Sequence, residues 1–149
     1  MRAVAQRVSR AQVRVEDEVT AAMQAGLLAL VGVARADTTE DAAYIAEKLV
    51  HLRVFADDEG RMNRSILETG GSLAVISQFT LLGDCRKGRR PAWADAAPPE
   101  IAEPLIEEVA ARARSLGASV VTGRFRARMQ VELVNDGPVT LLIDSTRVF

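Results

Sequence analysis

Apolar and polar residues alternate over several short stretches of the chain, as they do in strands that bury one face. Two other stretches, residues 27–33 and 72–79, are mostly apolar and predict central strands buried on both faces. The alternating stretches predict further strands at residues 2–8, 13–15, 19–23, 119–122, 129–134 and 139–143. The last two are separated by Asn135-Asp136-Gly137, a strong turn signal.

Two stretches have helical periodicity. Thr38 and Asp41 have the spacing of a capping box, and Gly117 is placed to end the second helix. The second helix opens at residues 98–100, although Pro104 allows the regular helix to begin only there. The apolar stripes are Ala42, Ile45, Leu49 and Leu52 in the first helix, and Ile101, Leu105, Val109, Ala113 and Leu116 in the second. The pattern of residues 62–68 does not distinguish a helix from a strand.

Strands interrupted by two main helices predict an α+β fold. We expect a mostly antiparallel, barrel-like sheet with the helices outside it, in a single domain over residues 1–149. Hydrophobic residues make up 48% of the chain, which is enough for a core, and only 4% are aromatic. The net charge of −1 predicts no global attraction to nucleic acid or membranes, so an anionic partner requires a local basic patch.

The lone cysteine, Cys85, can form no internal disulfide, which favours a reducing, cytoplasmic location. The N-terminus lacks the apolar core of a signal peptide, and the longest apolar run, residues 26–34, is too short to cross a bilayer. The only histidine, His51, sits near a predicted helix end and is better explained by structure than by catalysis. No spacing typical of a metal or cofactor site is present, so we expect neither group.

Cations cluster in the predicted loop of residues 83–93. Such a loop can bind phosphates and stack an aromatic ring on a base, or can simply be solvated, and the pattern alone does not decide between these. A second basic stretch, at 124, 126 and 128, would share one strand face and is explained equally well by solvation. The cations of the loop, with the only tryptophan, are Arg86, Lys87, Arg89, Arg90 and Trp93.

Two polar stretches carry the remaining candidate chemistry. Residues 77–80 either leave the core at a strand end or form an oxyanion site from backbone N–H groups and the amide of Gln78. Thr80 would be a nucleophile only with a base beside it, and none is visible. Residues 135–140 are in most such cases a hairpin turn, but can also hold two backbone carbonyls in a fixed, exposed orientation.

Together, Ser77-Gln78-Phe79-Thr80-Leu81 and Asn135-Asp136-Gly137-Pro138-Val139-Thr140 resemble the paired signature motifs of the D-aminoacyl-tRNA deacylases. Shorter matches lie in the family's order over the whole chain, at residues 6–8, 26–28, 62–63, 70–72, 90–91 and 122–125. The resemblance implies a cytoplasmic homodimer that hydrolyses the ester between a D-amino acid and the tRNA 3′ end. It also implies activity on glycine mischarged on tRNA(Ala), and no membrane or DNA partner.

The resemblance also assigns residues. Ser77, Gln78, Phe79 and Thr80 would form the catalytic site, with the Phe79 N–H as oxyanion donor and the substrate's own 2′-hydroxyl assisting. Gly137-Pro138 would be the Gly-cisPro motif, which enters the partner's pocket and holds the substrate amino group. Further substrate-binding residues would be Ala102, Asn135, Met129 and Arg7, and the tRNA would be bound by Arg86, Lys87, Arg89, Arg90 and Trp93.

The sequence departs from the family pattern in three places. Ala92-Trp93 replaces a more usual Ser-Phe, Arg126 and Arg128 make the stretch before Met129 more basic, and the tail at 144–149 is slightly longer. Two rival readings remain open: a non-catalytic module that binds RNA 3′ ends through the basic loop, and a structural oligomer in which residues 135–140 form only a hairpin.

Overall fold

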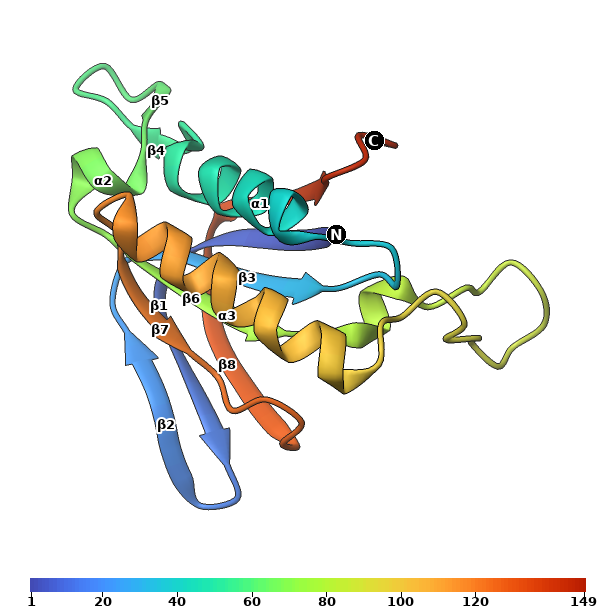
Figure 1. The fold of residues 1–149 in the computed structure, drawn as a ribbon. Helices are drawn as coiled ribbons and strands as arrows, with labels where there is room; N and C mark the ends of the chain where they lie inside the picture. The colour runs from blue at the N-terminus through green and yellow to red at the C-terminus, as the bar shows by residue number, and fades with distance from the viewer.

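One six-stranded sheet organises the computed structural model, which describes residues 1–149 (Figure 1). Its order is β2-β1-β3-β6-β7, and β8 pairs with the free side of β1. The strands are β1 (Arg2–Val15), β2 (Glu18–Met23), β3 (Gly26–Gly32), β6 (Ser72–Ser77), β7 (Ser119–Thr122) and β8 (Met129–Asp144). The pairs of β1 with β2, β3 and β8 are antiparallel, whereas β3, β6 and β7 run parallel.

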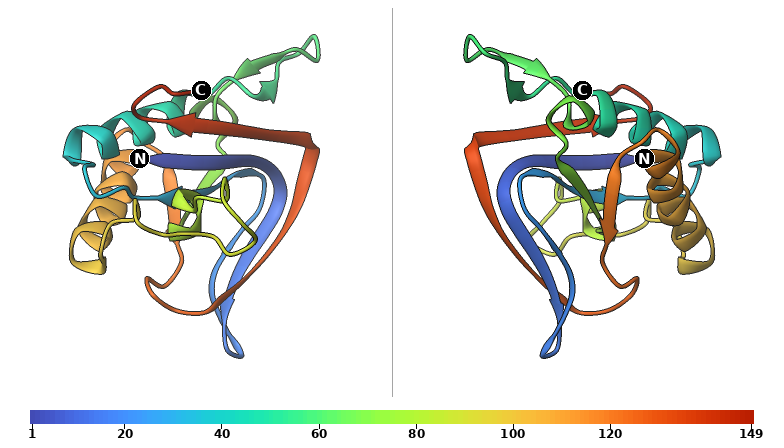
Figure 2. Two further views of the ribbon diagram at one scale, coloured as in Figure 1. Left: turned by 90° about the vertical axis from the view of Figure 1, so that its right-hand side faces the viewer. Right: turned by 90° about the vertical axis from the view of Figure 1, so that its left-hand side faces the viewer.

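The sheet curls towards a barrel because β1 and β8 are long and sharply bent (Figure 2). The first half of β1 pairs with β3 and its second half with β2, so one strand serves two parts of the sheet. Strands β2 and β7 come into contact and nearly close the barrel. The predicted α+β class and the mostly antiparallel, barrel-like core are confirmed.

The two predicted strands at 129–134 and 139–143 form one strand, β8, and the hairpin reading of the turn between them is wrong. Both halves pair with β1 and not with each other. Asn135 pairs with Val8 and Thr140 with Gln6, so the four β8 residues between Asn135 and Thr140 stand opposite the single residue Arg7. The turn residues therefore form a bulged corner within a continuous strand. Likewise, the predicted strands at 2–8 and 13–15 are one strand.

The helices α1 (Thr39–His51) and α3 (Pro99–Ser115) pack against each other and cover one face of the sheet (Figure 1). The predicted capping box is present: the Thr38 N–H donates to the Asp41 carboxylate at 2.8 Å. Helix α3 starts at Pro99 and not at Pro104, because proline suits the first helical position. Leu105, Val109 and Ala113 are buried as the stripe predicts.

Three members of the predicted stripes do not lie on the buried face of a helix. Ile101 is 41% exposed because it lies in the first turn of α3, beyond the edge of the core. Leu52 and Leu116 follow the ends of α1 and α3 as their C-caps. The ambiguous stretch resolves into β5 (Met62–Arg64), which pairs with β4 (Phe55–Ala56), and the short helix α2 (Ile66–Thr69). None of the helices combines the length and apolarity needed to span a bilayer.

Candidate active site

The polar stretch at 77–80 starts at the last residue of β6 and continues as a tight turn. The predicted strand at 72–79 stops at Ser77, and Phe79–Leu82 form a 3₁₀ helix. The Gln78 N–H still donates to the Val31 carbonyl at 2.8 Å, which fixes the turn to the end of β3. Phe79 opens the helix, and the leading N–H groups of a helix have no partner within it.

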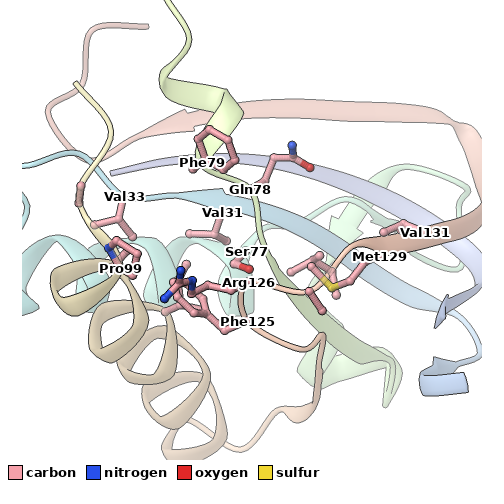
Figure 3. A pocket seen from close by; sticks show the side chains of 15 residues that line it. Val31, Val33, Ser77, Gln78, Phe79, Pro99, Phe125, Arg126, Met129 and Val131 are labelled. Atoms are coloured by element: carbon pink, nitrogen blue, oxygen red, sulfur yellow. The ribbon is translucent and has the colours of Figure 1, made fainter. Parts of the chain in front are cut away.

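A cleft of about 530 Å³ opens beside this turn (Figure 3). Three parts of the chain contribute most of its wall: the end of β6, the first turns of α3, and the segment from Phe125 to Val131, which includes the start of β8. Of the site residues named from the sequence, the cleft brings together Ser77, Gln78, Phe79, Ala102 and Met129. The sequence reasoning missed its other lining residues, which are Val31, Val33, Ile76, Ala97, Pro99, Ile106, Phe125, Arg126, Ala127 and Val131.

The cleft is mostly apolar and contains no carboxylate and no imidazole among its lining residues. Thr80 lies outside it, exposed, and its hydroxyl accepts a hydrogen bond from the Gln78 amide. His51 is on the surface of α1, where its Nε2 lies 3.5 Å from the Glu47 carboxylate. No side chain of the cleft can therefore act as a general base, and the cleft can supply only positioning, desolvation and hydrogen bonds.

The β8 corner, which we define as residues 135–140, is braced by three side chains: those of Arg7 and Asn135, and that of Gln6, whose amide donates to the Thr140 hydroxyl at 3.1 Å. The Arg7 Nε donates to the Asp136 carbonyl at 2.9 Å, and its guanidinium also donates to the Val54 carbonyl. The Asn135 amide accepts from the Val139 N–H at 2.9 Å and donates to the Thr140 hydroxyl at 3.0 Å. The Gly137–Pro138 peptide bond is cis, and both residues are exposed.

The corner and Arg7 do not line the cleft of their own chain. The catalytic and substrate-binding residues predicted from the sequence therefore lie in two separate groups. One group surrounds the apolar cleft at the end of β6, and the other fixes an exposed corner of β8.

The basic loop (residues 83–93) touches the rim of the cleft through one aromatic contact. The Trp93 and Phe79 rings meet edge to face, with centroids 5.3 Å apart. Arg86 forms an ion pair within the loop, where its Nε and Nη2 each donate to the Asp84 carboxylate at 2.8 Å. These hydrogen bonds hold the pKa of the Asp84 carboxyl far below its usual range. Lys87, Arg89 and Arg90 form no ion pair, so they are the loop cations free to meet phosphates.

Comparison with known proteins gives a consistent result. The family described as D-Tyr-tRNA(Tyr) deacylase matches residues 4–144. The chain is 60% identical to a D-aminoacyl-tRNA deacylase of Anaeromyxobacter dehalogenans and 56% identical to one of Desulforudis audaxviator, in both cases over 100% of each chain. Among solved structures, the c-Myc DNA Unwinding Element Binding Protein superposes with a TM-score of 0.91 at 35% identity, covering 97% of this chain and 98% of that one.

A probable eukaryotic D-amino acid tRNA deacylase shares the fold, with a TM-score of 0.79 at 17% identity, over 95% of this chain and 97% of the other. The family match and the relatives show that the chain is an enzyme, a hydrolase of the deacylase type. Within that class, it belongs to the D-Tyr-tRNA(Tyr) deacylase family, as the resemblance of its two motifs predicts.

Proposed function

We propose that the chain hydrolyses the ester bond of D-aminoacyl-tRNA, releasing the D-amino acid and free tRNA, in the cytoplasm. The observation that supports this best is the position of Ser77, Gln78 and Phe79 on a mostly apolar cleft whose lining contains no carboxylate and no imidazole. An aminoacyl ester is already activated, so hydrolysis needs a positioned water and a stabilised oxyanion more than it needs a strong base. Family membership supports the same activity.

In the proposed mechanism, the terminal adenosine and its aminoacyl group enter the cleft, and the ester carbonyl points at the turn after β6. The backbone N–H of Phe79 donates to the carbonyl oxygen as negative charge develops there. The side chains of Ser77 and Gln78 orient the ester. The 2′-hydroxyl of the terminal ribose assists the attacking water, which accounts for a cleft with no protein base among its lining residues.

Selection of the D-enantiomer belongs to the β8 corner of a second copy of the chain. In this homodimer, the Gly137 and Pro138 carbonyls of one protomer hold the substrate's amino group in the partner's cleft. With the amino group and the ester carbonyl both fixed, an L side chain is directed into the wall and a D side chain into open space. Glycine has no side chain to exclude, so glycine on tRNA(Ala) is also a substrate. The support is that the corner is exposed and braced, yet absent from its own cleft.

The test is deacylation of matched D- and L-tyrosyl-tRNA, with glycyl-tRNA(Ala) as a third substrate. We expect rapid release of D-tyrosine and glycine and negligible release of L-tyrosine. Ala102→Trp, which fills the cleft, provides the inactive control, and its melting temperature shows whether it folds. Release of D- and L-tyrosine at similar rates would refute the proposed selection.

A second candidate function is binding of nucleic acid ends without turnover. One relative of the same fold, 35% identical, carries the name of a DNA-unwinding-element binding protein, and Lys87, Arg89 and Arg90 are free to meet phosphates. The same assay separates the two functions, because a binding module would retain tRNA but leave every ester intact.

A further inference from the structure

Arg126 is the only charged residue among those that line the cleft. The other lining residues are mostly hydrophobic, and none of them is acidic. Its neighbour Arg124 pairs with Glu18 at 3.0 Å, whereas the Arg126 guanidinium makes no ion pair and no hydrogen bond within the chain. An unpaired guanidinium beside an apolar cleft is available to an anion from outside the protein.

The backbone holds Arg126 in an unusual conformation. Its φ of 61° lies in the left-handed region, which is unfavourable for a residue other than glycine. Figure 3 shows its side chain among those of the cleft, close to Phe125 and facing the start of α3. The first turn of that helix, which contributes Pro99 and Ala102 to the wall, adds the positive end of its dipole. The local field at this side of the cleft therefore favours negative charge, although Glu100 of the same turn, outside the lining, partly opposes it.

We propose that Arg126 binds the phosphate that joins the terminal adenosine of the substrate to the preceding nucleotide. This inference rests on the proposed function, because it takes the aminoacylated adenosine to be the occupant of the cleft. The phosphate is the closest anionic group to that adenosine, and a planar guanidinium matches two of its oxygens. Arg126 is then a positioning residue: it places the 3′ end, and it takes no part in breaking the ester.

A carboxylate on the amino acid, as in D-aspartate, is the other anion that could reach this guanidinium. The two sources are distinguished by substrates that carry one anion and not the other. Tyrosyl-tRNA carries only the phosphate, tyrosyl-adenosine carries neither, and aspartyl-tRNA carries both.

The experiment compares wild type, Arg126→Ala and Arg128→Ala on D-tyrosyl-tRNA and on D-tyrosyl-adenosine. Arg128 is the matched control, since it is exposed on the same segment but does not line the cleft. For Arg126→Ala we expect KM for the tRNA substrate to rise about tenfold with kcat nearly unchanged, the loss typical of one charge-assisted contact. The slope of log KM against log salt should fall by about one. On the adenosine ester the variant should equal wild type.

A second variant tests whether a loss of stability, and not the loss of the guanidinium, raises KM. Arg126→Gly suits the left-handed backbone, so it should keep the wild-type melting temperature while showing the same rise in KM. Three outcomes would overturn the inference: no difference between Arg126→Ala and Arg128→Ala on tRNA, an equal loss on the adenosine ester, or a loss confined to D-aspartyl-tRNA. If wild type leaves D-tyrosyl-tRNA intact, the proposed function itself fails, which is a distinguishable result.

Discussion

Thr80 is the residue whose role can be judged most directly from its contacts. Its hydroxyl is exposed, lies outside the cleft and accepts a hydrogen bond from the Gln78 amide. No histidine or carboxylate is hydrogen-bonded to it, so nothing activates it as a nucleophile. Its remaining use is to hold the Gln78 side chain in place.

We predict that Thr80→Ala and Thr80→Val keep kcat/KM for D-tyrosyl-tRNA within about tenfold of wild type, the cost of losing one hydrogen bond. Loss of a true nucleophile costs several orders of magnitude, as in serine hydrolases. The measurement is single-turnover deacylation, which reports the chemical step alone. Gln78→Ala removes the other partner of the same hydrogen bond and also the amide that we propose to orient the ester, so its loss of activity should exceed that of either Thr80 variant. A fall of a thousandfold or more in both Thr80 variants would show that the hydroxyl takes part in the reaction.

At the scale of elements, the parallel pairing of β3 with β6 positions the cleft, because Ser77 ends β6 beside Val31. Gly26 begins this pairing opposite Ser72, and a Cβ on Gly26 would lie 1.9 Å from the Ser72 carbonyl oxygen. The atoms that the added Cβ would meet belong to the backbone of Ser72, so no flexible side chain can move aside to make room. A side chain here must push the two strands apart at the end opposite the cleft.

We predict that Gly26→Ala lowers the free energy of unfolding by roughly 2–3 kcal/mol through overpacking. Gly60→Ala is the matched control: its φ is 78°, but an added Cβ would meet nothing within 4 Å, so only the backbone preference is lost, about 1 kcal/mol. Urea denaturation measures both. Equal losses in the two variants would mean that backbone preference, and not the close approach of β3 and β6, sets the cost.

The elements that the sequence predicted well are those whose pattern is local. The capping box at Thr38 and the buried run of β3 are examples, because each depends on neighbours in the chain. The continuity of β8 could not be predicted, since residues 135–138 give the same turn signal whether the flanking halves pair with each other or with a third strand. Only the pairing with β1 distinguishes these two cases, and that pairing joins opposite ends of the sequence.

The candidate site was also predictable only in part, since its polar residues stand out in the sequence and its apolar ones do not. The stretch at 77–80 attracted attention because polar residues after an apolar strand stand out in a sequence, and the family resemblance then assigned Ser77, Gln78 and Phe79 to the site. Val31, Ile106 and Phe125 did not stand out, since a cleft lined by apolar side chains looks the same in sequence as a core. Arg126 was visible as part of a basic stretch, but its alternation with Arg124 and Arg128 suggested a solvated strand face. All three arginines instead lie in the turn between β7 and β8, where Arg126 has a positive φ and is the only one of the three that lines the cleft.

At the scale of the whole molecule, the cleft and the β8 corner belong to different surfaces of one chain. The lining of the cleft includes no residue of the corner. If the corner selects substrates, it must act on the cleft of another copy, and a two-fold dimer then has two identical sites, each built from both protomers. This arrangement makes a prediction about mixtures of damaged subunits.

One variant blocks the cleft, Ala102→Trp, and the other displaces the corner, Gly137→Val. A Cβ on Gly137, whose φ is 145°, would lie 2.8 Å from both the backbone nitrogen and a side-chain carbon of Val139, so the corner must shift. Each variant alone should be nearly inactive on D-tyrosyl-tRNA. After the two are unfolded together and refolded at equal amounts, random pairing makes half of the dimers mixed, and each mixed dimer has one intact site. Activity should therefore return to about one quarter of wild type.

The activity of the mixed dimers depends on which protomer supplies the corner to each cleft, so this experiment distinguishes the two arrangements. If each corner served its own cleft, a mixed dimer would contain one blocked cleft and one displaced corner in separate sites, and no activity would return. Refolding each variant alone is the control for recovery of the fold, and native mass spectrometry, which resolves the different masses of the two variants, confirms that mixed dimers form. Restored activity with D-tyrosyl-tRNA, together with continued refusal of L-tyrosyl-tRNA, would assign both hydrolysis and chiral selection to a site that one chain cannot complete.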